Sequence, residues 1–152
     1  MHEFKVESKT DWALFSEALR RVDFLSTLNI GQLQLVLPFV TRRVFSAGET
    51  VCSQGAKGDA FYVVSKGKLS VRHKPGLFSF SKTVSTLGSG DYCGEMALLS
   101  NEPRSASVVC EEATELFVLT AKDFQYVLSQ NRPFADEIAM IAARRKSALD
   151  KG

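Results

Sequence analysis

Short segments rich in valine, phenylalanine, tyrosine and threonine alternate with glycine-containing turns between residues 41 and 120. Runs of this kind favour β-strands, and glycines between them favour tight turns. Several short strands at this spacing predict an antiparallel sandwich or a small barrel. The expected strands are 43–46, 50–53, 60–65, 68–73, 80–87, 105–111 and 114–120. A longer hairpin loop begins at Pro75-Gly76 and runs to about Ser79, and we assign no chemistry to it.

Residues 8–40, before the β-region, have the pattern of short helices. Ser8 or Thr10 can cap a first helix, because the apolar residues that follow recur at helical spacing. A second helix is expected to follow Asn29 and to end near Pro38, where the ring of proline stops helix propagation.

Residues 121–150, after the β-region, are expected to form the C-terminal helices. The last of these should begin near Pro133, since proline is well tolerated in the first turn. Its apolar stripe is interrupted at Arg145, where an apolar residue was due. Arg145 either snorkels at the edge of the stripe or faces something polar held beneath the helix. The stripe consists of Phe134, Ile138, Ile141, Arg145 and Leu149.

The bulk composition is that of a soluble globular chain. Its 152 residues suffice for one domain with a core, and they are too few for two ordinary domains. Nineteen basic and 17 acidic residues leave a net charge of +2, so no strong field draws the chain to nucleic acid. No apolar run approaches the ~20 residues that span a bilayer, and we expect no direct membrane insertion in this segment.

Three cysteines, Cys52, Cys93 and Cys110, lack the close spacings that metal sites use. An odd count without a signal peptide predicts reduced thiols in a cytosolic setting.

The basic ending ARRKSALDKG fits a truncated helix as well as a natural terminus, so the chain is compatible with a module of a larger protein.

One segment inside the β-region departs from the strand pattern. Residues 95–100, EMALLS, are mostly good helix formers bounded by Gly94 and Pro103. Helix N-termini attract anions through their free N–H groups and their dipole. The sequence therefore predicts a bound phosphate near this helical turn.

A phosphodiester needs a guanidinium fork with N–H donors, and a ribose hydroxyl needs a carboxylate acceptor. Arg104 offers the fork, Met96 and Ala97 the N–H groups, Ser105 a hydroxyl and Glu95 the acceptor. The alternative is that Glu95 and Arg104 form a salt bridge across the turn. That alternative leaves the adjacent glycine unexplained, whereas a ligand approaching the backbone would require a small residue there.

The run GDYCGEMALLSNEPRSASVV (Gly90 to Val109) closely resembles the phosphate-binding cassette of cyclic nucleotide-binding domains, F-G-E-x-A-L followed by P-R-x-A-x-V. The preceding QGAKGDAFYVVSKGKLSV resembles the family's Q-G-x-x-G-D-x-x-Y-x-V-x-x-G-x-x-x-V. The resemblance extends over about residues 22 to 149, and it is nearest to the modules of bacterial cyclic nucleotide-gated potassium channels. It departs from the pattern at Cys93, where the family has an aromatic residue.

The resemblance implies an α+β fold over residues 1–152. An antiparallel β-roll or jelly-roll barrel (41–120) would carry a short phosphate-site helix, flanked by N-terminal helices and C-terminal lid helices. In such a domain Glu95 would accept from the ribose 2′-hydroxyl and Arg104 would hold the cyclic phosphate. The other expected ligand-binding residues are Gly94, Met96, Ala97 and Ser105 at the phosphate and sugar, Val71 at the purine, and Ile141 and Arg145 on the lid helix.

We therefore expect a non-catalytic sensor that binds cAMP or cGMP and passes a lid-helix movement to an attached or associated effector, such as a channel or kinase. Related modules with Pro-Arg-Ser favour adenine, whereas the Ser105 hydroxyl could hold the amine of guanine, so cAMP is favoured over cGMP. The expected location is the cytoplasm, including the cytoplasmic part of a membrane protein.

Three other classes of protein are weighed against this expectation. A cupin-type metal oxygenase would need a cluster of imidazole ligands, but His2 and His73 are the only histidines. No nucleophile–base pairing stands out, so no catalytic residue, metal or cofactor is expected. The sensor half of a Crp-like transcription regulator would need a helix-turn-helix after the last helix, and none precedes Gly152. A non-binding structural relative is the remaining alternative.

Overall fold

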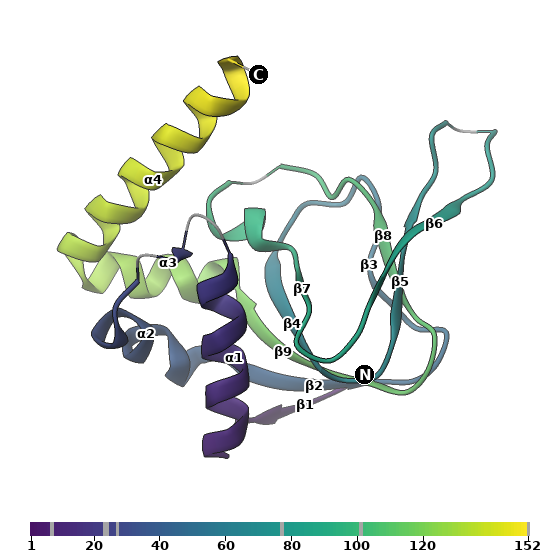
Figure 1. The fold of residues 1–152 in the computed structure, drawn as a ribbon, viewed down its shortest axis with the longest axis horizontal. Coiled ribbons are helices and arrows are strands. Elements are labelled where there is room, and N and C mark those ends of the chain that lie inside the picture. Colours follow the sequence, from purple (N-terminus) through teal and green to yellow (C-terminus); the bar gives the residue numbers. More distant parts are fainter. Residues whose placement is uncertain (7, 23–24, 27, 77, 101, 152) are drawn as a thin grey trace.

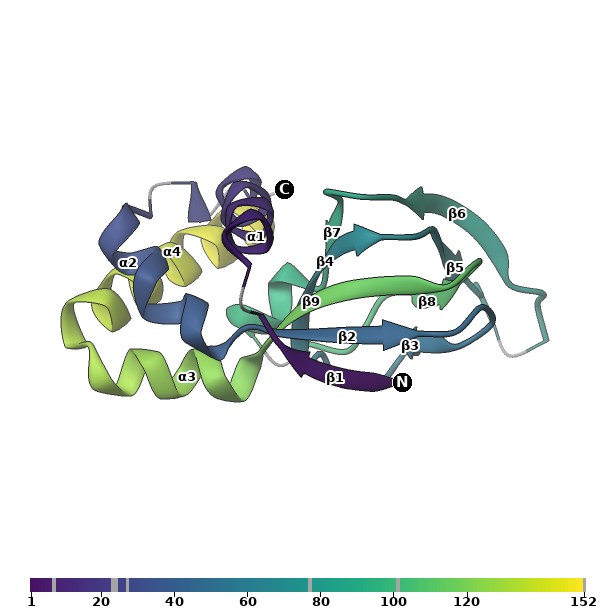
Figure 2. The same cartoon turned by 90° about the horizontal axis from the view of Figure 1, so that it is seen from below.

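In a computed structural model, the chain folds into two antiparallel β-sheets with several helices packed beside them (Figure 1). The structure describes residues 1–6, 8–22, 25–26, 28–76, 78–100 and 102–151, with side chains up to residue 144. Figure 2 shows most helices gathered at one end of the molecule and the strands at the other. The helices are α1 (Lys9–Arg21), α2 (Ile30–Val36), η2 (Leu37–Phe39), η3 (Glu95–Leu98), α3 (Ala121–Gln130) and α4 (Arg132–Lys151).

The strands form one sheet of five and one of four, in the orders β1-β2-β9-β4-β7 and β3-β8-β5-β6. All of the pairings are antiparallel, so the expectation of an antiparallel β-roll flanked by helices is confirmed. The strands are β1 (His2–Lys5), β2 (Thr41–Phe45), β3 (Thr50–Cys52), β4 (Ala60–Lys66), β5 (Leu69–His73), β6 (Lys82–Leu87), β7 (Tyr92–Cys93), β8 (Ser107–Cys110) and β9 (Thr114–Thr120).

Strand β4 is the element shared by the two parts of the core. Successive side chains of a strand point to opposite faces, and six of the seven residues of β4 are buried. Phe61 and Val63 belong to the cluster that the helices cover, whereas Tyr62 and Val64 belong to the cluster between the sheets. The strand therefore joins the helical layer to the β-roll.

The helix caps agree with the sequence and settle one choice. Ser8, rather than Thr10, caps α1: its hydroxyl accepts from two first-turn N–H groups, at 3.2 and 3.4 Å. Asn29 and Gln32 cap α2 reciprocally, with bonds of 2.8 and 2.9 Å. Thr120 caps α3 at 3.1 Å. These bonds satisfy donors that helices otherwise leave without partners.

Two short strands were not expected. Strand β1 lies at the edge of its sheet, where its residues are exposed and show no alternating pattern. It is stabilised by tertiary contacts: Phe4 lies 4.8 Å from the Arg42 guanidinium, and Glu3 pairs with Arg43 at 2.5 Å. Strand β7 has only two residues, paired with the middle of β4.

Among the described helices, none is both long and apolar enough to cross a membrane.

Phe15 of α1 tests the helical part of the core. Its side chain is 0% exposed and makes edge contacts with Phe61 and Phe117, at centroid distances of 5.9 and 6.5 Å. We expect Phe15→Ala to lower the free energy of unfolding by about 3–5 kcal/mol in urea denaturation, because it leaves a cavity. The exposed Phe78→Ala is the matched control and should change it by less than about 0.5 kcal/mol. Similar losses in both variants would contradict this packing.

Candidate functional site

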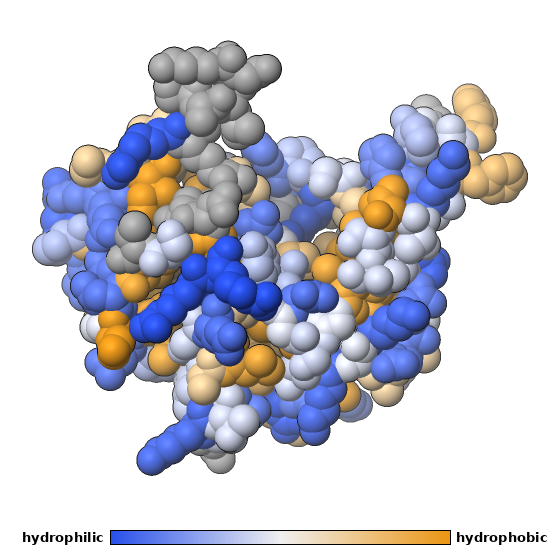
Figure 3. All heavy atoms as spheres, in the orientation of Figure 1, coloured by the Kyte–Doolittle hydropathy of each residue, from blue (hydrophilic) through white to orange (hydrophobic). Residues whose placement is uncertain are grey.

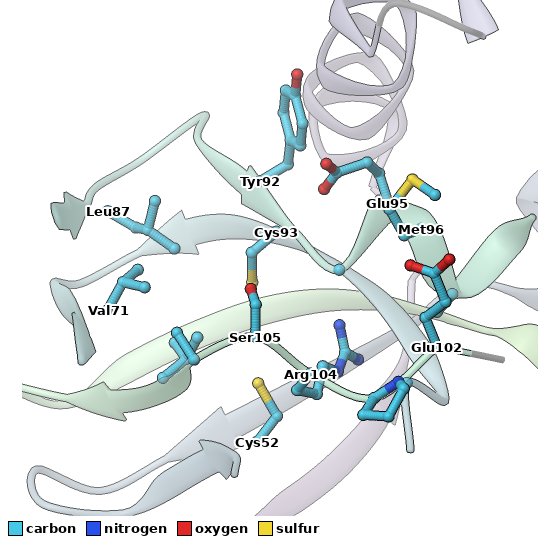
Figure 4. A pocket seen from close by; sticks show the side chains of 16 residues that line it. Cys52, Val71, Leu87, Tyr92, Cys93, Glu95, Met96, Glu102, Arg104 and Ser105 are labelled. Atoms are coloured by element: carbon cyan, nitrogen blue, oxygen red, sulfur yellow. The ribbon is translucent and has the colours of Figure 1, made fainter. Parts of the chain in front are cut away.

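Seven of the nine predicted site residues line one cavity of about 520 Å³ (Figure 4). They come from strand β5, from the turn that contains η3, and from the segment that leads into β8. The first and last of these residues, Val71 and Ser105, are 34 positions apart in the sequence, so the fold brings them together. The seven are Val71, Gly94, Glu95, Met96, Ala97, Arg104 and Ser105.

One wall of the cavity is apolar, and most of it was not predicted. Val71 and Val108 are directly paired across β5 and β8, and Leu87 ends the neighbouring strand β6. Figure 4 shows Val71 and Leu87 on the opposite side from the carboxylates of Glu95 and Glu102. Leu87 and Val108 lie on the strands next to Val71, so their place in the cavity follows from the registers of β6 and β8 on β5, which strand alternation alone does not give. The further unpredicted lining residues are Cys52, Gly58, Tyr92, Cys93, Glu102, Pro103 and Ala106.

Arg104 is a buried cation with incomplete partners. Its side chain is 9% exposed, and its Nη2 donates to the carbonyl oxygen of Ala60 at 2.7 Å. Its ion pair with Asp59 is long, at 3.6 Å, and that carboxylate is 77% exposed, so solvent screens the pair. The Nε–H of Arg104 is buried and has no hydrogen-bond partner among the described residues. A buried guanidinium with an unused donor favours a bound anion.

The ring of Tyr62 lies below the guanidinium of Arg104, 5.6 Å from Cζ to the ring centroid. Burial raises the pKa of the Tyr62 hydroxyl to about 12, so the ring stays neutral at physiological pH. The aromatic face stabilises the cation without adding a negative charge that would compete with an incoming anion.

Gly94 makes room for Arg104. Its φ of +78° lies in the left-handed region that favours glycine. A Cβ at this position would collide with Nη1 of Arg104 and would lie 2.5 Å from the Ala60 carbonyl oxygen. The sequence suggested that a small residue here admits a ligand to the backbone. The structure shows that it admits the guanidinium.

Glu95 and Arg104 do not form the salt bridge that was considered as an alternative: no ion pair joins them in the described part of the chain. Glu95 opens η3, and its carboxylate lies at the cavity edge next to Met96 in Figure 4. The N–H of Ala97, expected to assist a phosphate, donates to the carbonyl oxygen of Gly94 at 3.1 Å. The turn is therefore already hydrogen-bonded internally.

The two cavity thiols are not activated. Burial raises the pKa of Cys93 to about 12, and burial also raises the pKa of Cys52. A thiol with a raised pKa is a poor nucleophile, because the thiolate is the reactive form. Within the described ranges, no group of three or more histidine, cysteine, aspartate or glutamate residues could hold a metal ion.

Two predicted residues lie elsewhere. Ile141 does not line this cavity; it packs against the core cluster beneath the helices. The side chain of Arg145 lies outside the described residues, and its expected position over the ligand stays a prediction.

Backbone bonds connect the cavity to the C-terminal helices. The carbonyl of Ala60 holds Arg104, and the adjacent carbonyl of Asp59 accepts from the N–H of Ala121, the first residue of α3, at 2.8 Å. On the other side, η3 inserts Leu98 into the core cluster that also contains residues of α3 and α4. The segments that carry Arg104 and Glu95 are therefore both connected to the C-terminal helices, one through β4 and one through η3.

Comparison with known proteins identifies several relatives. The family model described as "Cyclic nucleotide-binding domain" matches residues 42–131. The chain is 34% identical over 119 residues to the cyclic AMP receptor protein of Thermus thermophilus, covering 78% of this chain and 55% of that protein. It is 31% identical over 140 residues to a Drosophila melanogaster cGMP-dependent protein kinase, covering 88% and 15%. It is 29% identical to the cyclic nucleotide-gated potassium channel RHE_CH03180 of Rhizobium etli, covering 90% and 40%.

The fold also matches solved structures. The regulatory domain of Toxoplasma gondii PKA in its co-crystal with cAMP superposes with a TM-score of 0.72 at 23% identity, covering 96% of this chain and 51% of that one. The chain spans about half of the length of its first relative and smaller parts of the kinase and the channel.

Substitution of Gly94 tests the close approach of Arg104. Gly48 also has a positive φ, of +87°, but a Cβ there would meet nothing within 4 Å. Gly48→Ala should therefore show only the cost of the left-handed backbone, roughly 1–2 kcal/mol. Gly94→Ala should cost at least about 1 kcal/mol more in urea denaturation, because the guanidinium must also move. Equal losses would show that the contact between Gly94 and Arg104 is not tight.

Proposed function

Because this chain belongs to the cyclic nucleotide-binding domain family, we propose that it is a non-catalytic sensor module, formed by residues 1–152, that binds a cyclic purine mononucleotide in the cavity. The observation that carries the proposal is the buried guanidinium of Arg104, which has an unused N–H and no close anionic partner in the described structure. A cyclic phosphate supplies one negative charge and the acceptor oxygens that this group lacks.

Arg104 binds the phosphate from a prepared position. The Ala60 carbonyl and the Tyr62 ring hold the guanidinium, so little side-chain freedom is lost when the ligand arrives. Ser105, the next residue along the chain, also lines the cavity and adds a hydroxyl to it. The distant and exposed Asp59 competes only weakly for the cation.

The sugar and the base fit the remaining surfaces. Glu95 accepts from the ribose 2′-hydroxyl, since it lies in the cavity and is not paired with Arg104. The purine packs against the apolar wall of Val71, Leu87 and Val108. Cys93, where the family has an aromatic residue, lines the cavity as a neutral thiol and leaves more space beside the ligand.

Ligand binding is transmitted through the two connections to the C-terminal helices. Arg104 donates to the carbonyl of Ala60, and the neighbouring Asp59 accepts from the first residue of α3. Glu95 is the first residue of η3, which packs into the helical core. A ligand shifts such an equilibrium only by its different affinity for the two arrangements. A contact of Arg145 with the ligand in one arrangement alone supplies part of that difference.

We propose cAMP as the preferred nucleotide. Two of the relatives carry cAMP in their names, although another is named for cGMP. The effector is a protein kinase or an ion channel attached to the module, because both classes occur among the relatives reported above.

Titration calorimetry of the chain with cAMP and with cGMP tests the proposal. We expect saturable binding of one nucleotide per chain, with the tighter constant for cAMP. Arg104→Ala should weaken it by about 2–5 kcal/mol, roughly 30-fold or more, because the phosphate loses its charged partner. Arg42→Ala removes the same charge far from the cavity, where Arg42 pairs with Glu115, and should retain near-normal affinity. Undiminished binding in folded Arg104→Ala would disprove the assignment.

A double-mutant cycle identifies the carboxylate that binds the sugar. With wild-type protein, 2′-deoxy-cAMP should bind about tenfold or more weakly than cAMP, because a charged hydrogen bond is lost. In Glu95→Ala the two nucleotides should bind alike, since the acceptor is already absent. Glu102→Ala removes the other cavity carboxylate and should preserve the full discrimination. Discrimination that survives in Glu95→Ala and disappears in Glu102→Ala would transfer the role to Glu102.

A further inference from the structure

The β5–β6 hairpin projects from the body of the molecule (Figure 1). The loop at its end carries two exposed aromatic residues. Phe78 is 100% exposed and Phe80 is 92% exposed. Figure 3 shows hydrophobic side chains standing clear of the surface at this tip. Single exposed apolar residues are ordinary, but two phenylalanines spaced by one residue at the end of a projection form an apolar patch. We assigned no chemistry to this loop from its sequence.

The charged side chains of the hairpin itself all have one sign. Between Arg72 and Gly90 the sequence contains no aspartate or glutamate. Arg72 is paired with Glu111 at 3.0 Å, so its charge is offset. Lys74 and Lys82 bracket the loop, are exposed, and form no ion pair with any described residue. The tip is therefore apolar at its end and positively charged at its base.

The shape and area of the tip discriminate between two classes of partner. A stable protein interface buries about 800 Å² on each side, whereas a phenylalanine supplies roughly 150–250 Å². Two rings on a convex loop fall well short of that area. A lipid surface needs no matching pocket, because its headgroup region admits small apolar groups and its anionic phosphates attract lysine.

We propose that this tip, Phe78 and Phe80 between Lys74 and Lys82, docks reversibly on an anionic lipid surface. The rings enter the boundary between headgroups and acyl chains, and the two lysines lie at the level of the phosphates. The combination of an apolar and a basic signal gives weak, salt-sensitive attachment rather than a permanent anchor. The earlier expectation of no membrane insertion rested on the absence of a spanning run, and a two-ring tip requires no such run.

Vesicle cosedimentation of the whole 152-residue chain tests the proposal. The protein should sediment with vesicles of phosphatidylcholine containing about 30% phosphatidylserine, bind pure phosphatidylcholine at least about tenfold less, and dissociate in about 0.5 M salt. The double variant Phe78→Ser/Phe80→Ser should lower the partition coefficient at least about tenfold. Lys74→Gln/Lys82→Gln should remove most of the dependence on salt and on phosphatidylserine.

Matched controls change other exposed residues elsewhere in the molecule. Ile30→Ser/Met140→Ser removes two exposed apolar side chains, 65% and 60% exposed, from α2 and α4. Lys66→Gln/Lys122→Gln removes two exposed lysines. Both pairs should partition like wild type, and urea denaturation verifies that every variant is folded.

Three results would overturn the proposal. The first is failure of the wild-type chain to bind anionic vesicles, and the second is unchanged binding of the folded Phe78→Ser/Phe80→Ser variant. The third has two parts: the wild-type chain does not bind vesicles but binds a purified protein, and the Phe78→Ser/Phe80→Ser variant loses that protein binding. This result would make the tip a protein-docking element. None of these outcomes depends on nucleotide binding in the cavity.

Discussion

The burial of one guanidinium is the constraint on which the site depends. A buried arginine needs partners to compensate for the water that it loses. Arg104 has a hydrogen bond to a strand carbonyl, a cation–π contact with an aromatic face and a long ion pair with a screened carboxylate. The requirement extends to its neighbours. Gly94 must lack a side chain because Arg104 occupies the space, and β4 must present the carbonyl of Ala60 at that position. The Nε–H of Arg104 is the part of the requirement that the described residues leave unmet.

Strand β4 meets that requirement because it is buried on both faces. Phe61 and Val63 hold it to the helices, and Tyr62 and Val64 hold it to the β-roll. A strand fixed from both sides presents its carbonyl with little freedom, which is the preorganisation that charge recognition needs. Asp59, the residue before this strand, accepts a hydrogen bond from Ala121, so the carbonyl that holds Arg104 is one residue away from the contact with the start of α3.

The sequence predicted the parts of this design that are periodic or local. Glycine-spaced segments indicated the roll, and Ser8 and Asn29 indicated helix starts. The residues around Glu95 and Arg104 stood out because a helical turn interrupts strands. The sequence could not supply the partner of Arg104, since Ala60 is 44 positions away and contributes only a backbone carbonyl, which every residue has.

Other features were missed because no pattern marks them. Strand β1 consists of exposed residues held by contacts with β2, so neither alternation nor burial distinguishes it. Leu87 reaches the cavity through the register of β6 on β5, which a single sequence does not specify. The loop at Phe78 resembled an ordinary turn until its exposure was known.

The β5–β6 hairpin supplies Val71 and Leu87 to the cavity at one end and carries the exposed rings at the other. If a nucleotide fills the cavity and a lipid surface holds the tip, as proposed above, any coupling through this hairpin must be reciprocal. The factor by which an occupied cavity changes affinity at the tip then equals the factor by which an occupied tip changes affinity in the cavity. The nucleotide concentration that half-saturates the cavity would then differ between a lipid surface and free solution.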